Sequence, residues 1–246
     1  MVTQYGKTAA IVVIGNEILS GKVIDTNSPY LARELRTLGV DLQRIAVVPD
    51  QIESIGEEIA FCHKRYDLIF TSGGVGPTHD DVTMEGIAKG VERPLVHHPV
   101  LDQLLRTAYQ KNLNPAELKL ADVPEGLELL YAETLRVPVL HFENIYIFPG
   151  IPELLVRKFE AIKERFRETP FYLRKIFLTA SEASIAAGLN QVLAQYPHLL
   201  LGSYPILHHP DYQVILTLES KDKDYLEEST ASLLSTLPKE SVFKTE

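Results

Sequence analysis

Apolar runs and amphipathic stretches alternate along the first third of the chain, a pattern typical of an α/β fold. Runs that suit strands buried on both faces of a parallel sheet occupy residues 8–14, 42–48 and 68–72. The segments between them carry apolar residues at helical spacing: Leu31, Leu35 and Leu38 in the first, and Ile52, Ile55, Ile59 and Cys62 in the second. Alternating strands and helices predict right-handed crossovers and a doubly wound, mostly parallel sheet with helices on both faces, a three-layer α/β/α fold.

The helix ends and the middle of the chain carry weaker signals. We expect Asn27 or Ser28 to cap the first helix and Gly39 to end it. Short helices are expected at 99–111 and 116–121. Strands at 137–142 and 145–148 would form a hairpin, and an amphipathic helix should follow Pro152.

The pattern changes after Glu168-Thr169-Pro170, which we take as a domain boundary. Residues 1–170 would form the α/β domain and residues 171–246 a second domain. The expected elements of the second domain are a strand at 176–179, a helix at 182–195, strands at 199–203 and 213–219, and a helix at 224–237. This βαββα order predicts a small α+β domain.

A glycine-rich turn at 71–83 follows the third expected strand and leads into a helix at 83–90. Its glycines allow a sharp turn and a close ligand approach, and backbone amides beside a helix start favour anions. Asp80 and Asp81 would repel a bare phosphate unless a divalent metal lies between them and the phosphate. Asp at a helix start is also a good cap, so a purely structural role stays open.

Other polar segments follow the expected parallel strands, and this convergence favours a binding site. Gly15-Asn16-Glu17 follows the first strand and Pro49-Asp50 the second, and ligands of such sheets bind at the carboxyl ends of the strands. The run GGVGPT lacks the spacing of a dinucleotide fingerprint and the Gly-Lys-Ser/Thr ending of a Walker A loop.

Seven motifs, in order along the chain, resemble the molybdopterin-binding (MoCF biosynthesis) superfamily. They are IGNEIL at 14–19, DTN at 25–27, VVPD at 47–50, GGVGPTHDDVT at 73–83, FPGIPEL at 148–154, EASI at 182–185 and GSYP at 202–205. More narrowly, the chain looks like the amino-terminal domain of CinA proteins and the front domain of eukaryotic FAD synthases. The resemblance implies a MogA-like α/β fold in the first domain.

The resemblance also implies which residues act. Asp50 and Asp81 would hold a divalent cation and, with Asp80, take part in catalysis; an aspartate after Pro49 is otherwise a common turn former. Residues implied in binding substrate or phosphate are Gly15, Glu17, Asn27, Gly73, Gly74, Val75, Gly76, Pro77, Thr78, His79, Thr83, Pro149 and Gly150. Asn16 departs from the Gly-Asp-Glu of several relatives, so we assign it no metal.

The implied activity is that of a nucleotide pyrophosphatase that splits FAD or ADP-ribose to AMP and a phosphate monoester. A divalent metal, Mg²⁺, Co²⁺ or Mn²⁺, would assist, with potassium as a further option. The alternatives are a module that binds molybdopterin or a nucleotide, FAD included, without turnover, and a molybdopterin adenylyltransferase.

Composition argues against nucleic acids and membranes as partners. The net charge of −9 lacks the basic footprint of nucleic-acid binding, and no apolar run is long enough to span a membrane. The single cysteine, Cys62, lies on an apolar helical stripe and suits a buried filler in a cytoplasmic protein.

The resemblance and the small second domain predict a homo-oligomer, with a dimer favoured. Adjacent histidines in the runs His97-His98 and His208-His209 would point to opposite faces of an extended backbone, so we expect solvated loop residues there.

Overall fold

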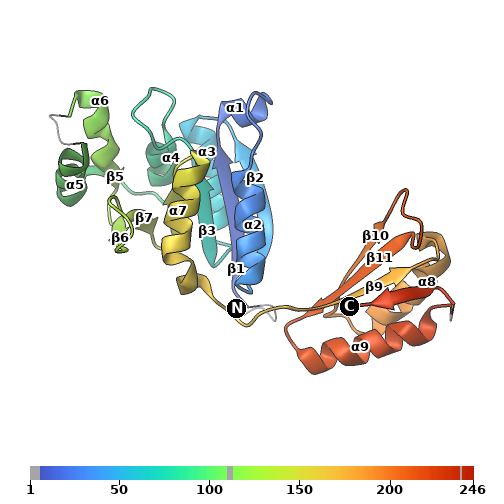
Figure 1. Cartoon of the computed structure of the whole chain (residues 1–246). Helices are drawn as coiled ribbons and strands as arrows, with labels where there is room; N and C mark the ends of the chain where they lie inside the picture. The colour runs from blue at the N-terminus through green and yellow to red at the C-terminus, as the bar shows by residue number, and fades with distance from the viewer. Residues whose placement is uncertain (1–5, 110–112, 239) are drawn as a thin grey trace. The chain divides into compact units, whose positions relative to one another are not determined.

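The computed structural model describes residues 6–109, 113–238 and 240–246 (Figure 1). The chain divides into two compact units, Met1–Glu168 and Thr169–Glu246. The expected boundary, after Pro170, lies close to this division. Each unit is described by itself.

The first unit is built on a six-stranded sheet with the order β2-β1-β3-β8-β7-β6. Its strands are β1 (Thr8–Ile14), β2 (Asp41–Val48), β3 (Leu68–Ser72), β6 (Glu128–Leu130), β7 (Val139–Phe142) and β8 (Ile145–Phe148). β1 runs parallel to β2 and β3, and β3 runs parallel to β8. Only β7 is antiparallel to its neighbours β6 and β8, so the expected mostly parallel sheet and the hairpin at Glu143-Asn144 are confirmed.

Helices cover both faces of this sheet, as the apolar runs predict (Figure 1). One core contains side chains of α3 (Ile52–His63) and α4 (Thr83–Gly90), and the other those of α2 (Asn27–Thr37) and α7 (Pro152–Ile162). Successive residues of β1 alternate between the two cores, since side chains of a strand point to opposite faces. The three-layer α/β/α fold is therefore confirmed.

Cys62 lies in the core on the α3 side and is fully buried. Its Sγ donates a hydrogen bond of 3.2 Å to Glu58 Oε1. Burial, reinforced by Glu58, raises the pKa of the Cys62 thiol to about 12. The side chain is a buried, protonated filler, as predicted.

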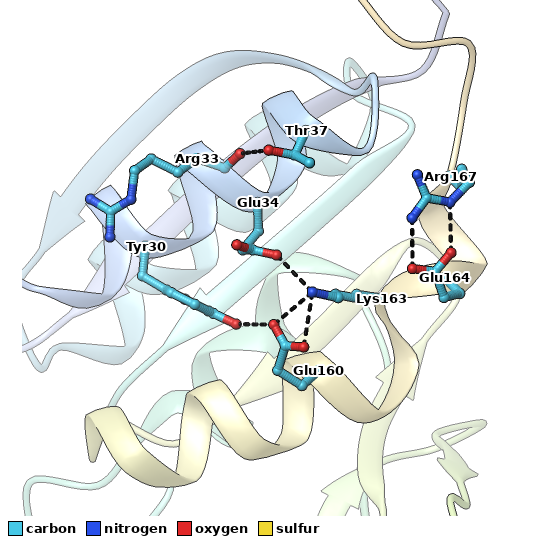
Figure 2. A network of polar contacts seen from close by, with 8 residues as sticks. All are labelled: Tyr30, Arg33, Glu34, Thr37, Glu160, Lys163, Glu164 and Arg167. Atoms are coloured by element: carbon cyan, nitrogen blue, oxygen red, sulfur yellow. Dashed lines mark hydrogen bonds and ion pairs between the residues drawn. The ribbon is translucent and has the colours of Figure 1, made fainter.

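A polar network joins α2 to α7 and to the short 3₁₀ helix Lys163–Phe166 (Figure 2). It belongs to the face of the sheet whose core contains side chains of α2 and α7. Lys163 Nζ lies 2.9 Å from Glu34 Oε2 and 2.8 Å from Glu160 Oε2. The Tyr30 hydroxyl donates to Glu160 Oε1 at 2.7 Å. Hydrogen bonding by Lys163 lowers the pKa of Glu160, so this carboxylate is charged at neutral pH.

For this unit the expected cap of α2 is wrong and some short elements were not predicted, whereas the two short helices in the middle of the chain are confirmed with shifted ends. The first residue before α2 is Thr26, so neither Asn27 nor Ser28 is the cap; Asp25 Oδ1 instead accepts from both their amides at 3.0 Å. Short elements absent from the sequence prediction are α1 (Asn16–Leu19), β4 (Leu95–His97), β5 (Asp122–Pro124) and β6. The helix expected at 116–121 is α6 (Pro115–Leu118) followed by a 3₁₀ turn (Lys119–Ala121). α5 covers Pro99–Tyr109, and residues 110 and 111 of that expectation lie outside the described residues.

The second unit contains an antiparallel sheet with the order β10-β11-β9-β12. Its elements are β9 (Tyr172–Leu178), α8 (Glu182–Gln195), β10 (Leu200–Pro205), β11 (Val214–Ser220), α9 (Lys223–Thr236) and β12 (Val242–Thr245). Buried and half-buried residues alternate strictly along β11, which places one face of the sheet in a core shared with α8 and α9. The small α+β domain is confirmed, but its order is βαββαβ, because β12 pairs with β9.

Candidate functional site

The carboxyl ends of four parallel strands meet at one edge of the first sheet. β1, β2, β3 and β8 are parallel neighbours, so the segments that follow Ile14, Val48, Ser72 and Phe148 lie together. Two backbone hydrogen bonds join them: Gly15 N donates to Val48 O at 3.1 Å, and Gly73 N donates to Phe148 O at 3.2 Å.

The glycine turn after β3 uses backbone conformations that only glycine adopts easily. Gly73 has φ +107° and Gly74 has φ +62°. A Cβ on Gly73 would lie 2.1 Å from Ile14 O, and one on Gly74 would lie 2.3 Å from Thr83 Oγ1. Thr83 Oγ1 in turn donates to Gly73 O at 2.9 Å. The turn is therefore packed directly against β1 and the start of α4.

Asn27, at the start of α2, joins two of these strand ends. Its Nδ2 donates to Ser72 Oγ at 2.9 Å and to Gly150 O at 2.8 Å, and the side chain is almost fully buried. The predicted residue is thus at the site, with its amide hydrogens used within the protein. Ser72 was not among the predicted residues, although its place at the last position of a buried strand before the glycines could have indicated it.

Asp81 closes the glycine turn. Its Oδ2 accepts a hydrogen bond from Thr78 N at 2.9 Å and another from the Thr78 hydroxyl. A Cβ on Gly76 would lie 2.5 Å from the same oxygen, so the carboxylate lies directly over the turn. The N-cap of α4 is Val82, with no side-chain cap hydrogen bond, so the alternative of Asp81 or Asp80 as a helix cap is wrong.

The remaining predicted acids lie on separate segments. Asp50 Oδ2 accepts from Asn16 N at 2.7 Å and thereby fixes the start of α1. The Glu17 carboxylate lies 2.6 Å from the position that a Cβ on Gly15 would occupy. Asp80 and His79 are exposed, with 3.9 Å between His79 Nδ1 and Asp80 Oδ1. Hydrogen bonding by the Thr78 side chain lowers the pKa of Asp80, so this carboxyl is ionised at neutral pH.

Two cavities flank the glycine turn and divide the predicted residues between them. The larger, about 400 Å³, is lined by the predicted residues Gly74, Val75, Gly76, Asp81 and Pro149. The smaller, about 100 Å³, is lined by Glu17, Asn27, Gly73 and Gly150, with Asp25 and Ser72. Among the described residues, the predicted positions Gly15, Asp50, Pro77, Thr78, His79, Asp80 and Thr83 line neither cavity.

The carboxylates form no protein-only metal site. No group of three or more His, Cys, Asp or Glu side chains in the described ranges is placed to hold a metal ion. Mg²⁺, however, is often bound by one or two carboxylates together with substrate phosphates. Asp81, beside the glycine turn and on the larger cavity, fits that second pattern.

The paired histidines take other roles. His97 belongs to β4, with its Nδ1 2.8 Å from Asp122 Oδ1, so the expectation of a solvated loop residue is wrong there. His98 Nδ1 accepts from Leu101 N at 3.2 Å, near the start of α5. His208 and His209 are exposed residues outside helices and strands, and His209 stacks on Tyr212 with 3.7 Å between ring centroids.

Comparison with known proteins identifies the first unit. Residues 10–168 match the family described as "Probable molybdopterin binding domain". The chain belongs to this molybdopterin-binding family. Within the family it also carries, at residues 170–246, a match to the "FAD synthase, middle domain". The resemblance inferred from the motifs is confirmed for both units.

Relatives of this chain include proteins of similar and of greater length. A protein from Archaeoglobus fulgidus is 36% identical over 214 residues, which cover 87% of this chain and 91% of that protein. The "Probable FAD synthase" of Caenorhabditis briggsae is 32% identical, and the match covers 90% of this chain but only 48% of that protein. The crystal structure of a CinA protein from Thermoplasma acidophilum aligns with a TM-score of 0.60 at 29% identity, covering 65% of this chain and 98% of that one.

Among the described residues, none of the helices combines the length and the apolar composition that crossing a bilayer requires.

Proposed function

We propose that the first unit binds a phosphorylated pterin or nucleotide at the carboxyl edge of its sheet. The observation that carries this proposal is the glycine turn, which reaches a 400 Å³ cavity through Gly74, Val75 and Gly76. Pockets of this size accommodate ligands of nucleotide dimensions. Exposed amides of a glycine turn beside a helix start suit phosphate oxygens. The family description, a molybdopterin-binding domain, supports the same class of ligand.

The binding proposal predicts a specific loss in Gly74→Ala. The new methyl group would meet Thr83 Oγ1 and would require a backbone conformation at φ +62° that costs about 1 kcal/mol or more. Calorimetric titration of FAD and ADP-ribose should show binding to the unchanged protein and at least about tenfold weaker binding to the variant. Gly188→Ala, on α8 in the second unit, serves as the control. Failure of both compounds to bind the unchanged protein would contradict the proposal.

A second candidate is hydrolysis at the same site. In this scheme water adds across a phosphoanhydride bond, so FAD gives AMP and FMN, and ADP-ribose gives AMP and ribose phosphate. The position of Asp81 favours it, because this carboxylate lies beside the turn that would hold the diphosphate. A divalent cation, Mg²⁺, Mn²⁺ or Co²⁺, with potassium as a further option, would supply Lewis-acid chemistry when bound by Asp81, by Asp50 and by phosphate oxygens. The relatives named FAD synthases also support a nucleotide-directed activity, but this chain spans about half of their length.

Asp81→Asn separates hydrolysis from simple binding. An uncharged amide is a poor ligand for a hard cation, so AMP release should fall by orders of magnitude. Asp50→Asn should act alike, and the double variant should be little worse than either single one. AMP is measured by chromatography with each metal in turn, and Asp211→Asn, exposed in the second unit, serves as the control. Tight binding of FAD or ADP-ribose without any AMP would support the binding module and contradict the hydrolase.

The location proposed for this activity is the cytoplasm. This proposal rests on the single cysteine, Cys62, which is buried and forms no disulfide. A fold without disulfides needs no oxidising compartment.

A further inference from the structure

Three cationic side chains on the larger cavity have no role in the site described so far. Arg136 precedes β7, and Arg157 and Lys158 lie on α7, and all three line the cavity. None of them pairs with a carboxylate within the part of the chain that the structure describes. Three cations without a carboxylate partner around one cavity are unusual in a chain of net charge −9.

Lys158 is the most constrained of the three. Its Nζ donates to Val137 O at 3.1 Å and to Pro138 O at 2.5 Å, and these carbonyl oxygens orient the ammonium group without neutralising it. An ammonium group has three hydrogens to donate, so one remains for a ligand. Desolvation by burial, with the nearby Arg157 charge, lowers the pKa of Lys158 to about 8. A half-buried, partly desolvated ammonium of this kind gains from an anion beside it.

The other charged groups on the cavity do not cancel these three positive charges. Lys119 Nζ lies 2.8 Å from Glu85 Oε1, and Asp122 Oδ1 lies 2.8 Å from His97 Nδ1. Asp81 accepts hydrogen bonds from Thr78. The lining carries three carboxylates against four Lys or Arg side chains, so its net charge is +1.

Most of the remaining lining is apolar. It consists of Met84, Leu95, Leu101, Leu105, Leu120, Val137, Leu140, Ile147 and Leu154, with Pro149 and parts of the glycine turn. Such a surface accepts a flat ring system, since rings gain most from desolvation against aliphatic side chains. The cavity thus combines a mostly apolar lining with three cationic side chains that suit an anionic group.

We propose that the larger cavity holds a flat heterocycle and that Lys158, Arg157 and Arg136 bind a phosphate group carried by that heterocycle. This inference rests on the proposed function and deepens it by naming the chemical class of the ligand. Flavin and adenine nucleotides share this chemistry. Two pairs of compounds differ only in the phosphate group: FMN with riboflavin, and AMP with adenosine. Comparing the pairs shows whether the heterocycle is a flavin or an adenine.

The test is calorimetric titration of all four compounds into the unchanged protein and into Lys158→Met. The unchanged protein should bind the phosphorylated member of at least one pair about tenfold or more tightly than its partner, as expected for charge-assisted hydrogen bonds. Lys158→Met should lose most of that difference while keeping its affinity for the unphosphorylated compound. Lys158→Arg should retain the difference, which excludes a folding defect as the cause.

Lys163→Met, further along the same chain segment, is the matched control, because Lys163 faces Glu34 and Glu160 rather than the cavity (Figure 2). It should leave all four affinities unchanged. A phosphate preference that survives Lys158→Met overturns the inference, and so does equal loss for both members of a pair. If FMN and AMP fail to bind while FAD or ADP-ribose binds in a manner sensitive to Gly74→Ala, the inference fails and the proposed function stands. If no phosphorylated compound binds, both fail.

Discussion

At the residue scale, the carboxyl edge of the first sheet is held together by side chains that bind neighbouring backbone segments. Asn27 joins the ends of β3 and β8 through Ser72 and Gly150, and Asp50 fixes the amide of Asn16. Each of these contacts uses a polar group that a ligand could otherwise have met. In the proposals above, phosphate would therefore meet backbone amides of the glycine turn and the cationic side chains of Lys158, Arg157 and Arg136.

At the same scale, Lys158 should make the affinity for a phosphorylated ligand depend on pH. Its pKa is lowered to about 8, chiefly by desolvation, and a bound phosphate would favour the charged form. Affinity for a phosphorylated ligand should therefore be highest below pH 8 and fall as the pH rises through this value, where the amine loses its proton. The second ionisation of a phosphate, near pH 6, does not interfere in this range.

Titrations of FMN and AMP between pH 7 and pH 9.5 check this expectation. The other charged groups on the cavity are Asp81, Glu85, Lys119, Asp122, Arg136 and Arg157. In Lys158→Arg the guanidinium stays charged, so its affinity should be flat over the range. An equally steep fall in this variant would show that another group is responsible.

At the scale of elements, the aromatic core holds α7 to the sheet far more strongly than the polar network does. Phe159 is fully buried, with ring centroids 5.9 Å from Phe70 and from Phe166. Phe159→Ala should lower the free energy of unfolding by about 3–5 kcal/mol. Lys163→Met, which removes half-exposed ion pairs, should cost about 1 kcal/mol or less. Urea denaturation of both variants measures the two values, and comparable losses would contradict this ranking.

The sequence prediction was accurate for strongly patterned, buried elements and missed short, exposed ones. The bounds of β3, α4 and α8 were predicted residue for residue, because continuous apolar runs or strong periodicity mark them. β4 was missed since all three of its residues are exposed, and β12 since only four residues carry the pattern.

The site was predicted in part for a related reason. The glycine turn, Asp81 and Asn27 stand in motifs that are continuous in the sequence. The cavity wall of Arg136, Arg157 and Lys158 could not be predicted, because it forms only when separate segments come together around the turn. The local signal in Arg157-Lys158 is two adjacent cations on an amphipathic helix, which is typical of any solvated helix face.

At the scale of the whole molecule, we propose that the chain forms a dimer. The second unit exposes large apolar side chains, with Leu207 81%, Tyr204 53% and Phe243 49% exposed. Light scattering at micromolar concentration should give about twice the chain mass of 27.6 kDa.

Leu207→Glu should shift that mass toward the monomer, and Ile24→Glu, equally exposed in the first unit, should not. A mass near 27.6 kDa for the unchanged protein would contradict the proposal.

The pairing of β3 with β8 also bears on how the proposed ligand site forms during folding. These strands are adjacent in the sheet but far apart in the sequence, with the whole segment from α4 to β7 between them. Closing so long a segment costs chain entropy before these contacts stabilise the fold, which slows folding. The hydrogen bonds from Gly73 to Phe148 and from Asn27 to Gly150 need that closure. The proposed site would therefore be complete only in chains that have closed this segment, and a ligand that binds it would stabilise those chains over the unfolded ones.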